Sequence, residues 1–251
     1  MRALSASDIL YVWEVGQQKH AVDRALLLLA VALPAFSPAA LSSLTIGQRN
    51  SQLLLLRQKT LGTVAMCFVQ CPRCNEKLEF TLDLRAMLPA AVEAPVGPGE
   101  LSEHIYTLSV DAFTLNFRVP TSADLASIAR AVDTREGSRL LIEQCVVGAT
   151  RDEQDVSVEN LPENVLQALS GAVIERDPLA EMEFALHCPA CQHDWTTLFD
   201  IVSFFWTELE TLAKRLLRDV HTVASAYGWR ESDILALSAV RRQFYLELIR
   251  S

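Results

Sequence analysis

Two short cysteine motifs, far apart in the chain, carry the clearest chemical potential in the sequence. CPRC occupies residues 71 to 74, and CPAC occupies residues 188 to 191. Cysteines with this spacing can hold a zinc ion, act as redox dithiols or form disulfides. The residues that surround the two motifs indicate which of these three chemistries applies.

Each motif lies between two segments that have the alternating pattern of a β-strand. The apolar run GTVAMCFVQ precedes the first motif, and EKLEFTLDL follows it with Leu78, Phe80 and Leu82 alternating with polar residues. EMEFALH and DWTTLFD repeat this plan around the second motif. The pattern predicts strand, tight turn and strand in both places. Each cysteine pair should therefore lie at the tip of a hairpin, with proline stiffening the turn.

A structural zinc site explains this arrangement better than the alternatives. Redox CxxC motifs open a helix, whose N-terminal dipole lowers the thiol pKa, whereas strand patterns follow both motifs here. Disulfides are rare in the reducing cytoplasm, where we expect the chain because it shows no export signal. Two hairpin tips that meet face to face would form a tetrahedral site from Cys71, Cys74, Cys188 and Cys191. We predict one structural Zn ion there and no open coordination position for catalysis.

The remaining cysteines and the histidines beside the motifs are expected to stay outside the site. His187 precedes Cys188, and His193 follows Cys191 by two positions, so either imidazole is able to replace a thiolate; flanking positions are the simpler interpretation. Cys67 and Cys145 lie in the apolar stretches VAMCFV and LIEQCVV. Unpaired cysteines in such stretches are most often small core residues.

The composition indicates a folded globular protein whose partners are proteins. The chain has 251 residues, of which 50% are hydrophobic and 21% charged, and its net charge is −9. Residues 61–199 carry nine Lys and Arg against twenty-one Asp and Glu. Such an acidic surface repels phosphates, so nucleic acid is an unfavourable partner. The apolar run from Ala25 to Phe36 is shorter than the roughly 20 residues of a membrane span. It predicts a buried helix ended by Pro34 and Pro38, with no membrane contact.

The elements that must position the cysteines divide the chain into five segments of an α+β fold. The two hairpins form a split zinc ribbon that is interrupted by a small insert of strands and helices. The predicted segments are an N-terminal helical region over 1–62, the first zinc-knuckle hairpin over 63–94, the strand-helix insert over 95–179, the second zinc-knuckle hairpin over 180–199 and the C-terminal helices over 200–251.

The insert has its own pattern of strands and helices. Its linker, Ala94 to Glu103, is rich in proline and glycine. HIYTLSV and FTLNFRV predict a hairpin, and TSADLASIARAV predicts a helix capped by Thr121 or Ser122, with apolar spacing up to Val132. SRLLIEQCVV and LPENVLQALSGAV predict two further helices. We expect the acidic runs RDEQD and ERDPLAE to be solvated.

The C-terminal region is predicted to be helical. Asp200 is a suitable cap for a long helix that ends at Gly228, with one apolar stripe from Ile201 to Val223. The following stretch, WRESDILALSAVRRQFYLELI, predicts two short helices.

The short C-terminal helices suggest two kinds of contact. We expect Trp229, Arg241, Arg242 and Tyr245 to bind a protein partner. The alternative is a zinc-containing DNA-binding regulator that uses a helix-turn-helix-like segment with Arg230, Arg241 and Arg242. The nearly balanced charge of this stretch favours the protein contact.

Catalytic motifs are absent from the sequence. It contains no phosphate-binding glycine-rich loop, no G-x-S-x-G, no H-E-x-x-H and only five histidines. We therefore expect a protein that is not an enzyme.

Three patches resemble known phage proteins. LTIGQRNSQLLLLRQKTLGTVAMCFVQCPRCNEKLEFTLDL resembles the segment of T-even-type baseplate hub assembly proteins in which a helix leads into a strand and a CPxC knuckle. FRVPTSADL and ASAYGWRESDILALSAVRRQFYLELI are similar to elements of related small proteins of phage tails and contractile injection systems. The second cysteine pair does not map onto the shorter members, so the four-thiolate site depends on the hairpin argument.

This resemblance implies a non-enzymatic role in building a baseplate hub. It implies hub, spike or wedge proteins as partners. The protein would act as a chaperone in the cytoplasm or stay as a component of the assembled phage or injection particle.

Overall fold

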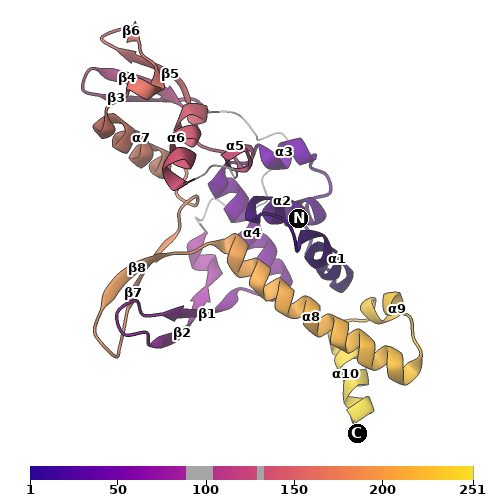
Figure 1. Cartoon of the computed structure of the whole chain (residues 1–251). Coiled ribbons are helices and arrows are strands. Elements are labelled where there is room, and N and C mark those ends of the chain that lie inside the picture. Colours follow the sequence, from indigo (N-terminus) through magenta and orange to yellow (C-terminus); the bar gives the residue numbers. More distant parts are fainter. Residues whose placement is uncertain (89–103, 129–132, 251) are drawn as a thin grey trace.

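The computed structural model describes residues 1–88, 104–128 and 133–250. It shows the α+β fold that the sequence predicts, organised around one long helix, α8 (Ile201–Tyr227) (Figure 1). At 1.5 Å per residue, a helix of this length spans about 40 Å. The predicted linker Ala94–Glu103 and Val132 lie outside the described residues.

Four N-terminal helices form the body that packs against α8. They are α1 (Ala6–Gly16), α2 (Ala21–Ala32), α3 (Pro38–Ser42) and α4 (Ile46–Leu61). Helices α1, α2 and α4 each contact α8. Leu28 and Leu29 of α2 are fully buried, and the helix ends before Pro34. The prediction of a short buried helix is therefore confirmed.

Helix α4 is buried along most of its length although it carries many polar side chains. It begins at a capping box in which Thr45 and Gln48 exchange hydrogen bonds. The amide of Asn50 donates to the carbonyl oxygen of Leu179 at 2.9 Å. The Arg57 guanidinium pairs with Glu208 of α8 and donates to the backbone carbonyls of Gly62 and Val64. These bonds tie α4 to the segments that carry the cysteines.

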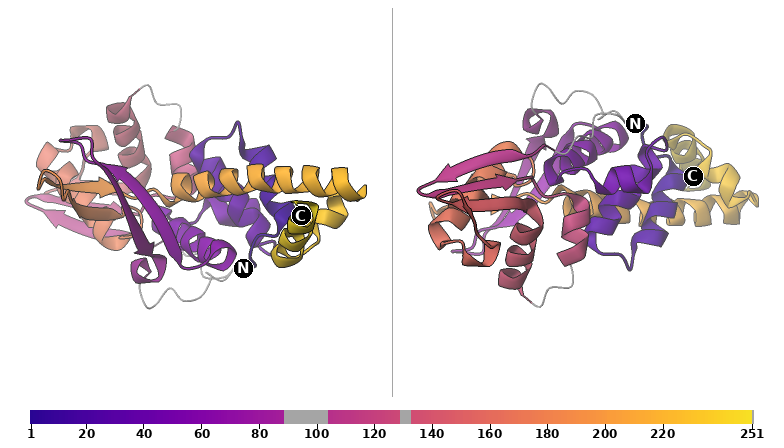
Figure 2. Two further views of the ribbon diagram at one scale, coloured as in Figure 1. Left: turned by 90° about the horizontal axis from the view of Figure 1, so that it is seen from below. Right: turned by 90° about the horizontal axis from the view of Figure 1, so that it is seen from above.

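The two cysteine motifs lie in antiparallel hairpins, as predicted. Strand β1 (Val64–Gln70) pairs with β2 (Lys77–Asp83), and β7 (Glu183–His187) pairs with β8 (Asp194–Leu198). The 3₁₀ helix η1 (Leu84–Met87) follows β2. Strand β1 follows α4 almost directly, and β8 leads almost directly into α8. Because α4 packs on α8, both hairpins extend from the same helical base (Figure 2).

The insert folds around a four-stranded antiparallel sheet with the order β3-β4-β5-β6. The hairpin and the last helix are found where the sequence predicts them. The elements are β3 (Tyr106–Val110), β4 (Phe113–Phe117), α5 (Ser122–Ile128), α6 (Thr134–Cys145), β5 (Val146–Arg151), β6 (Gln154–Asp155), η3 (Val158–Asn160) and α7 (Glu163–Arg176).

Two local predictions for the insert are wrong. The helix predicted to continue through Val147 ends at Cys145, because Val146 pairs with Phe117 and starts strand β5. The residues of RDEQD are exposed, as expected, but Asp177 of the run ERDPLAE is only 7% exposed. Pairing with the sheet and packing against α4 override the local sequence pattern in these two places.

The C-terminal helices follow the prediction closely. Asp200 accepts a hydrogen bond from the backbone N–H of Val202 at 2.9 Å and so caps α8. Gly228 ends the helix in the left-handed conformation with φ of 67°. Helices α9 (Glu231–Leu235) and α10 (Ala239–Arg250) then fold back onto α8.

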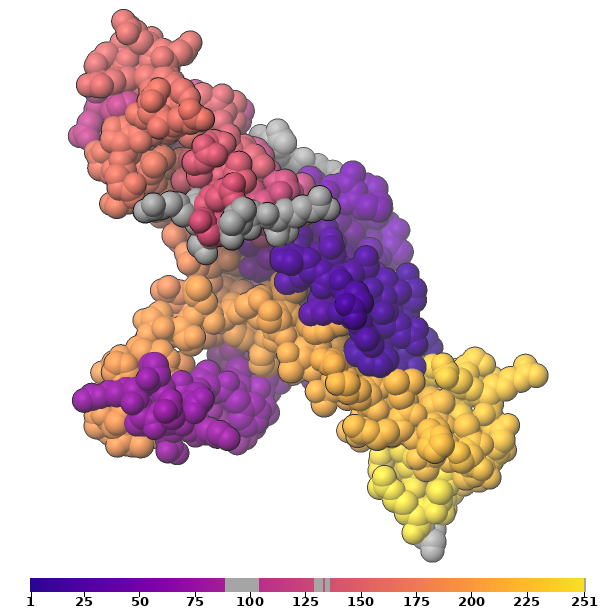
Figure 3. Space-filling model, in the orientation of Figure 1, coloured from indigo at the N-terminus to yellow at the C-terminus, as the bar shows by residue number. Residues whose placement is uncertain are grey.

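The buried apolar side chains of the described residues form two cores. The larger one joins the N-terminal helices, β1 and α8 to α10. The smaller one belongs to the insert and includes Leu115, Phe117, Val165 and Leu169. Figure 3 shows the insert, the hairpins and the C-terminal helices as three projections. None of the helices in the described ranges is both long and apolar enough to cross a membrane.

Candidate metal centre

The tips of the two hairpins bring all four motif cysteines together. The sulfur atoms of Cys71, Cys74, Cys188 and Cys191 all lie within 4.8 Å of one another. Sγ of Cys71 is 3.7 Å from Sγ of Cys191, and Sγ of Cys74 is 3.6 Å from Sγ of Cys188. The cluster therefore joins parts of the chain that are separated by 114 to 120 residues.

Both hairpin tips have the same backbone geometry. The N–H of Cys71 donates to the carbonyl of Glu76, and the N–H of Cys188 donates to the carbonyl of His193, each at 2.9 Å. Asn75 and Gln192, which follow the second cysteine of each motif, have positive φ values of 60° and 57°. This equivalence makes the cluster two copies of one turn that face each other. Neither motif opens a helix, so the geometry differs from that of redox dithiols.

The backbone around the first motif favours a thiolate. Burial opposes the ionisation of Cys71, but hydrogen bonds from the backbone of Cys74 and Arg73 outweigh it and lower the pKa of this thiol to about 7. A backbone hydrogen bond from Glu76 favours a lower pKa for Cys74. The hydrogen bonds with Cys191 and Cys188, together with burial, outweigh it and raise this pKa to about 12. Thiolate charges this close repel each other, so the ionisations of Cys71, Cys74 and Cys191 depend on one another.

The sulfur positions fit the dimensions of a tetrahedral zinc site. A Zn–S bond of about 2.3 Å gives sulfur–sulfur edges of about 3.8 Å in a tetrahedron. The Cys74–Cys188 and Cys71–Cys191 sulfur separations of 3.6 and 3.7 Å are close to that value. Four thiolate ligands are also the donor set of many structural zinc sites. The residues present therefore suit a divalent, thiolate-preferring metal ion such as zinc.

The flanking histidines make contacts outside the sulfur cluster. Nδ1 of His187 lies 2.7 Å from a carboxylate oxygen of Asp194, which raises the pKa of this histidine chiefly through that hydrogen bond. The imidazole of His193 stacks on Trp195. Cys67 and Cys145 are buried at 6% and 3% exposure, in agreement with their prediction as core residues.

The four C-terminal residues predicted to bind a partner have different surroundings. Trp229 and Tyr245 pack edge to face with ring centroids 4.9 Å apart. Arg241 is exposed, whereas Arg242 is only 7% exposed and places Nε 3.4 Å from a carboxylate oxygen of Asp219. Arg242 thus holds α10 against α8, and the DNA-binding alternative, which uses its charge on the surface, gains no support from this geometry.

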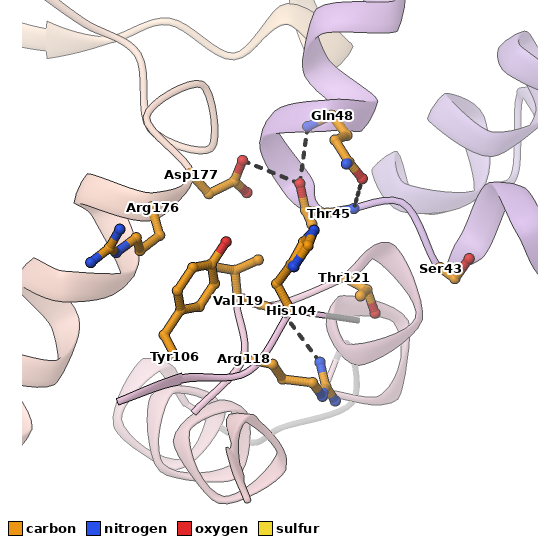
Figure 4. Close-up of a pocket in the computed structure, with 10 residues that line it drawn as sticks. All are labelled: Ser43, Thr45, Gln48, His104, Tyr106, Arg118, Val119, Thr121, Arg176 and Asp177. Carbon is orange, nitrogen blue, oxygen red and sulfur yellow. Dashed lines mark hydrogen bonds between the residues drawn. The ribbon is translucent and has the colours of Figure 1, made fainter. Parts of the chain in front are cut away.

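A polar junction that the sequence did not reveal joins the insert to the N-terminal helices. A cavity of about 180 Å³ lies there, and Figure 4 shows its lining residues. Asp177 follows α7 and accepts hydrogen bonds from the backbone N–H of Gly47 at 2.8 Å and from the hydroxyl of Thr45 at 3.1 Å. It thereby caps the first turn of α4 from outside the helix. The sequence signal was hidden because Asp177 belongs to a charged run that resembles ordinary surface.

The fold and the site define an α+β protein in which two hairpins, separated by an inserted sheet domain, join through a four-cysteine cluster. The chain belongs to the family described as T4 bacteriophage base plate protein, whose model matches residues 24–206. No curated protein and no solved structure gives a significant match to the chain.

The family match extends from α2 to the first turns of α8 and includes both hairpins and the insert. It confirms the resemblance to T4-type baseplate proteins that the sequence patches indicate. Membership gives the chain a role related to the phage baseplate and implies interactions with other baseplate proteins.

Proposed function

We propose that the chain is a non-enzymatic, zinc-stabilised protein-binding factor for assembly of a contractile-tail or injection-system baseplate hub. It acts as an assembly chaperone or as a component that stays in the particle, and its partners are hub, spike or wedge proteins. The observation that carries this proposal is the four-sulfur cluster within a chain of the T4 baseplate family.

The role of the zinc ion is structural in this proposal. Bound to four thiolates, zinc joins the two hairpins into a split ribbon and leaves no coordination position for water or substrate. The protein groups serve the same end, because the backbone N–H groups that face Cys71 favour its charged form. A closed site of this kind supports a protein that organises surfaces for partners.

Metal analysis tests the zinc site. We expect the purified protein to contain one zinc per chain, and Cys71→Ser and Cys188→Ser each to remove it, since each variant removes one ligand of a shared site. Cys67→Ala and Cys145→Ala are matched controls that should retain the metal, because both cysteines lie in the core outside the cluster. Folded Cys71→Ser and Cys188→Ser proteins that keep a full zinc complement would refute the shared site.

Co-purification tests the assembly role. The tagged, zinc-loaded chain is co-expressed with each hub, spike and wedge protein encoded beside it. We expect at least one of them to co-purify under gentle conditions. If none does, the assembly role is wrong. Absence of zinc together with two reversible disulfides would instead favour a redox enzyme.

A further inference from the structure

One side of α8 carries a long apolar groove that no part of the described chain covers. The groove begins between β1 and α8, where Met66 and Phe68 face Phe204 and Leu212. It continues between α8 and α10, where Leu212 and Leu216 face Val240 and Phe244. Leu212 and Arg215 line both halves, so the two hollows are continuous. We call this feature the α8 groove.

The walls of the α8 groove expose several large apolar side chains to solvent. Val240 is 81% exposed, Phe68 is 71% exposed and Phe244 is 57% exposed. Large apolar patches on a soluble protein usually mark interaction sites. The first hairpin and α10 lie on the same side of α8 in two perpendicular views (Figures 1 and 2). The exposed side chains therefore border one surface.

The dimensions of the α8 groove suit a helix. Its floor runs from Ser203 to Asp219, which corresponds to about 24 Å of helix axis at 1.5 Å per residue. A partner helix of about 16 residues would cover this length. Val240 and Phe244 are one helical turn apart and form a ridge of the kind that packs between the side chains of another helix.

The charges along the α8 groove specify the chemistry of that helix. Arg57 pairs with Glu208 near one end, and Arg242 pairs with Asp219 near the other. Arg215 is exposed between them and has no ion-pair partner among the described residues. A carboxylate on the occupant would neutralise this central cation, whereas Glu208 and Asp219 already have cationic partners. Glu247, which also lines the α10 half, accepts a hydrogen bond from Gln243.

From these features we infer that the α8 groove binds an amphipathic helix of another baseplate protein, with an acidic residue midway along its apolar face that pairs with Arg215. This inference rests on the proposed assembly role and names the surface that performs it. The family match ends at residue 206, so α10 and most of the floor lie beyond it.

Matched variants of the zinc-loaded full chain test the inference. Each hub, spike and wedge protein encoded beside the chain is purified singly, and its affinity is measured by calorimetry. We expect Arg215→Glu and Phe244→Asp each to weaken binding of one of them at least about tenfold, as buried aromatic and arginine contacts typically do. Arg218→Glu and Tyr11→Asp change exposed residues outside the groove and should leave the affinity unchanged. Circular dichroism and zinc content establish that each variant is folded.

A charge exchange supplies the decisive measurement. Reversing one acidic residue on an amphipathic helix of the partner should weaken binding to the native chain and restore binding to Arg215→Glu. If a partner binds and neither groove variant affects it, the groove inference is overturned while the assembly role stands. If no baseplate protein binds, the assembly role fails first. A dimer of the chain that dissociates on Arg215→Glu would show that a second copy occupies the groove, which also overturns the inference.

Discussion

The junction between Asp177 and Gly47 gives a quantitative prediction about how the insert is fixed to the N-terminal helices. Asp177→Ala removes the acceptor of the buried Gly47 N–H, which is 2.8 Å from the carboxylate. A buried donor without a partner costs about 1–3 kcal/mol, and the hydroxyl of Thr45 loses its acceptor as well. We expect the free energy of unfolding to fall by about 2–3 kcal/mol.

Asp177→Asn separates the hydrogen bond from the charge. Burial raises the pKa of Asp177 more than its hydrogen bonds lower it, so the ionised carboxylate is disfavoured in the folded state. The stabilisation from this group is complete below its ordinary pKa and is lost as the pH rises through the raised value. At pH 7.5 an uncharged acceptor should therefore be tolerated, and Asn should cost less than about 1 kcal/mol.

A double-mutant cycle completes this prediction. A Cβ added at Gly47 would lie 2.0 Å from Oδ1 of Asp177 and 3.1 Å from the backbone nitrogen of Ala180. Gly47→Ala must therefore displace the carboxylate and break the same hydrogen bond, at a cost of about 2–3 kcal/mol. Once Asp177 is Ala, the main clash is gone, and the higher helix propensity of alanine, about 1 kcal/mol, offsets the remaining close contact with the nitrogen of Ala180.

The cycle is measured by urea unfolding of the zinc-loaded protein, followed by circular dichroism. We expect the double variant to be about as stable as Asp177→Ala alone, which corresponds to a coupling of about 2–3 kcal/mol. Additive losses, within about 0.5 kcal/mol, would show that Asp177 and Gly47 do not share one interaction. A loss for Asp177→Asn as large as that for Asp177→Ala would refute the role of the acceptor.

Three further predictions concern the ion pairs and the metal. Arg57→Met should lower the free energy of unfolding by about 2–4 kcal/mol. The substitution removes the ion-pair partner of Glu208 and leaves the Gly62 and Val64 carbonyls without these donors. A loss below about 0.5 kcal/mol in urea unfolding would contradict this prediction. Burial raises the pKa of Asp124, but hydrogen bonds from Arg118 and Thr121 outweigh it and lower the pKa, so its stabilisation is present above the ordinary pKa and is lost as the pH falls through the lowered value. The difference in the free energy of unfolding between the native chain and Asp124→Asn should accordingly shrink as the pH falls from 6 to 3. A constant difference would exclude this titration. Any loss of metal in acid affects both proteins alike and cancels in the difference. Chelation of the metal should accelerate amide exchange in β1, β2, β7 and β8 but not in β3 to β5, since the insert has its own core; equal acceleration in both would show that the insert depends on the cluster.

The parts of the fold that depend on local periodicity could be predicted from the sequence. Alternation around the cysteines placed β1, β2, β7 and β8, and Asp200 and Gly228 marked the ends of α8 because caps and left-handed glycines act locally. The cluster could be anticipated because the same turn sequence occurs twice. The association of the two turns depends on α4 packing against α8, a contact that no local pattern records.

The predictions that failed depend on contacts between distant residues. Val146 and Val147 continue a helical pattern, and only the neighbouring strand β4 makes them part of the sheet. Asp177 has the sequence surroundings of a surface charge, yet it is buried against residues distant in the chain. The exposure of the apolar side chains in the α8 groove could not be predicted for the opposite reason. Phe68 and Phe244 occupy positions whose sequence pattern is typical of buried residues.

The separation of the two cysteine pairs also determines how long the first pair waits for the second during synthesis. Cys188 follows Cys74 by 114 residues, which ribosomes add in about 6–23 s at rates of roughly 5–20 residues per second. During this interval the emerging chain presents half of the four-cysteine cluster and an α4 whose leucines still lack their contacts with α8. The stretch that begins at Cys188 and continues through α8 supplies both missing halves. A nascent chain that stops before this stretch therefore leaves its first cysteine pair and the leucines of α4 without partners, and one late folding event supplies both sets of partners.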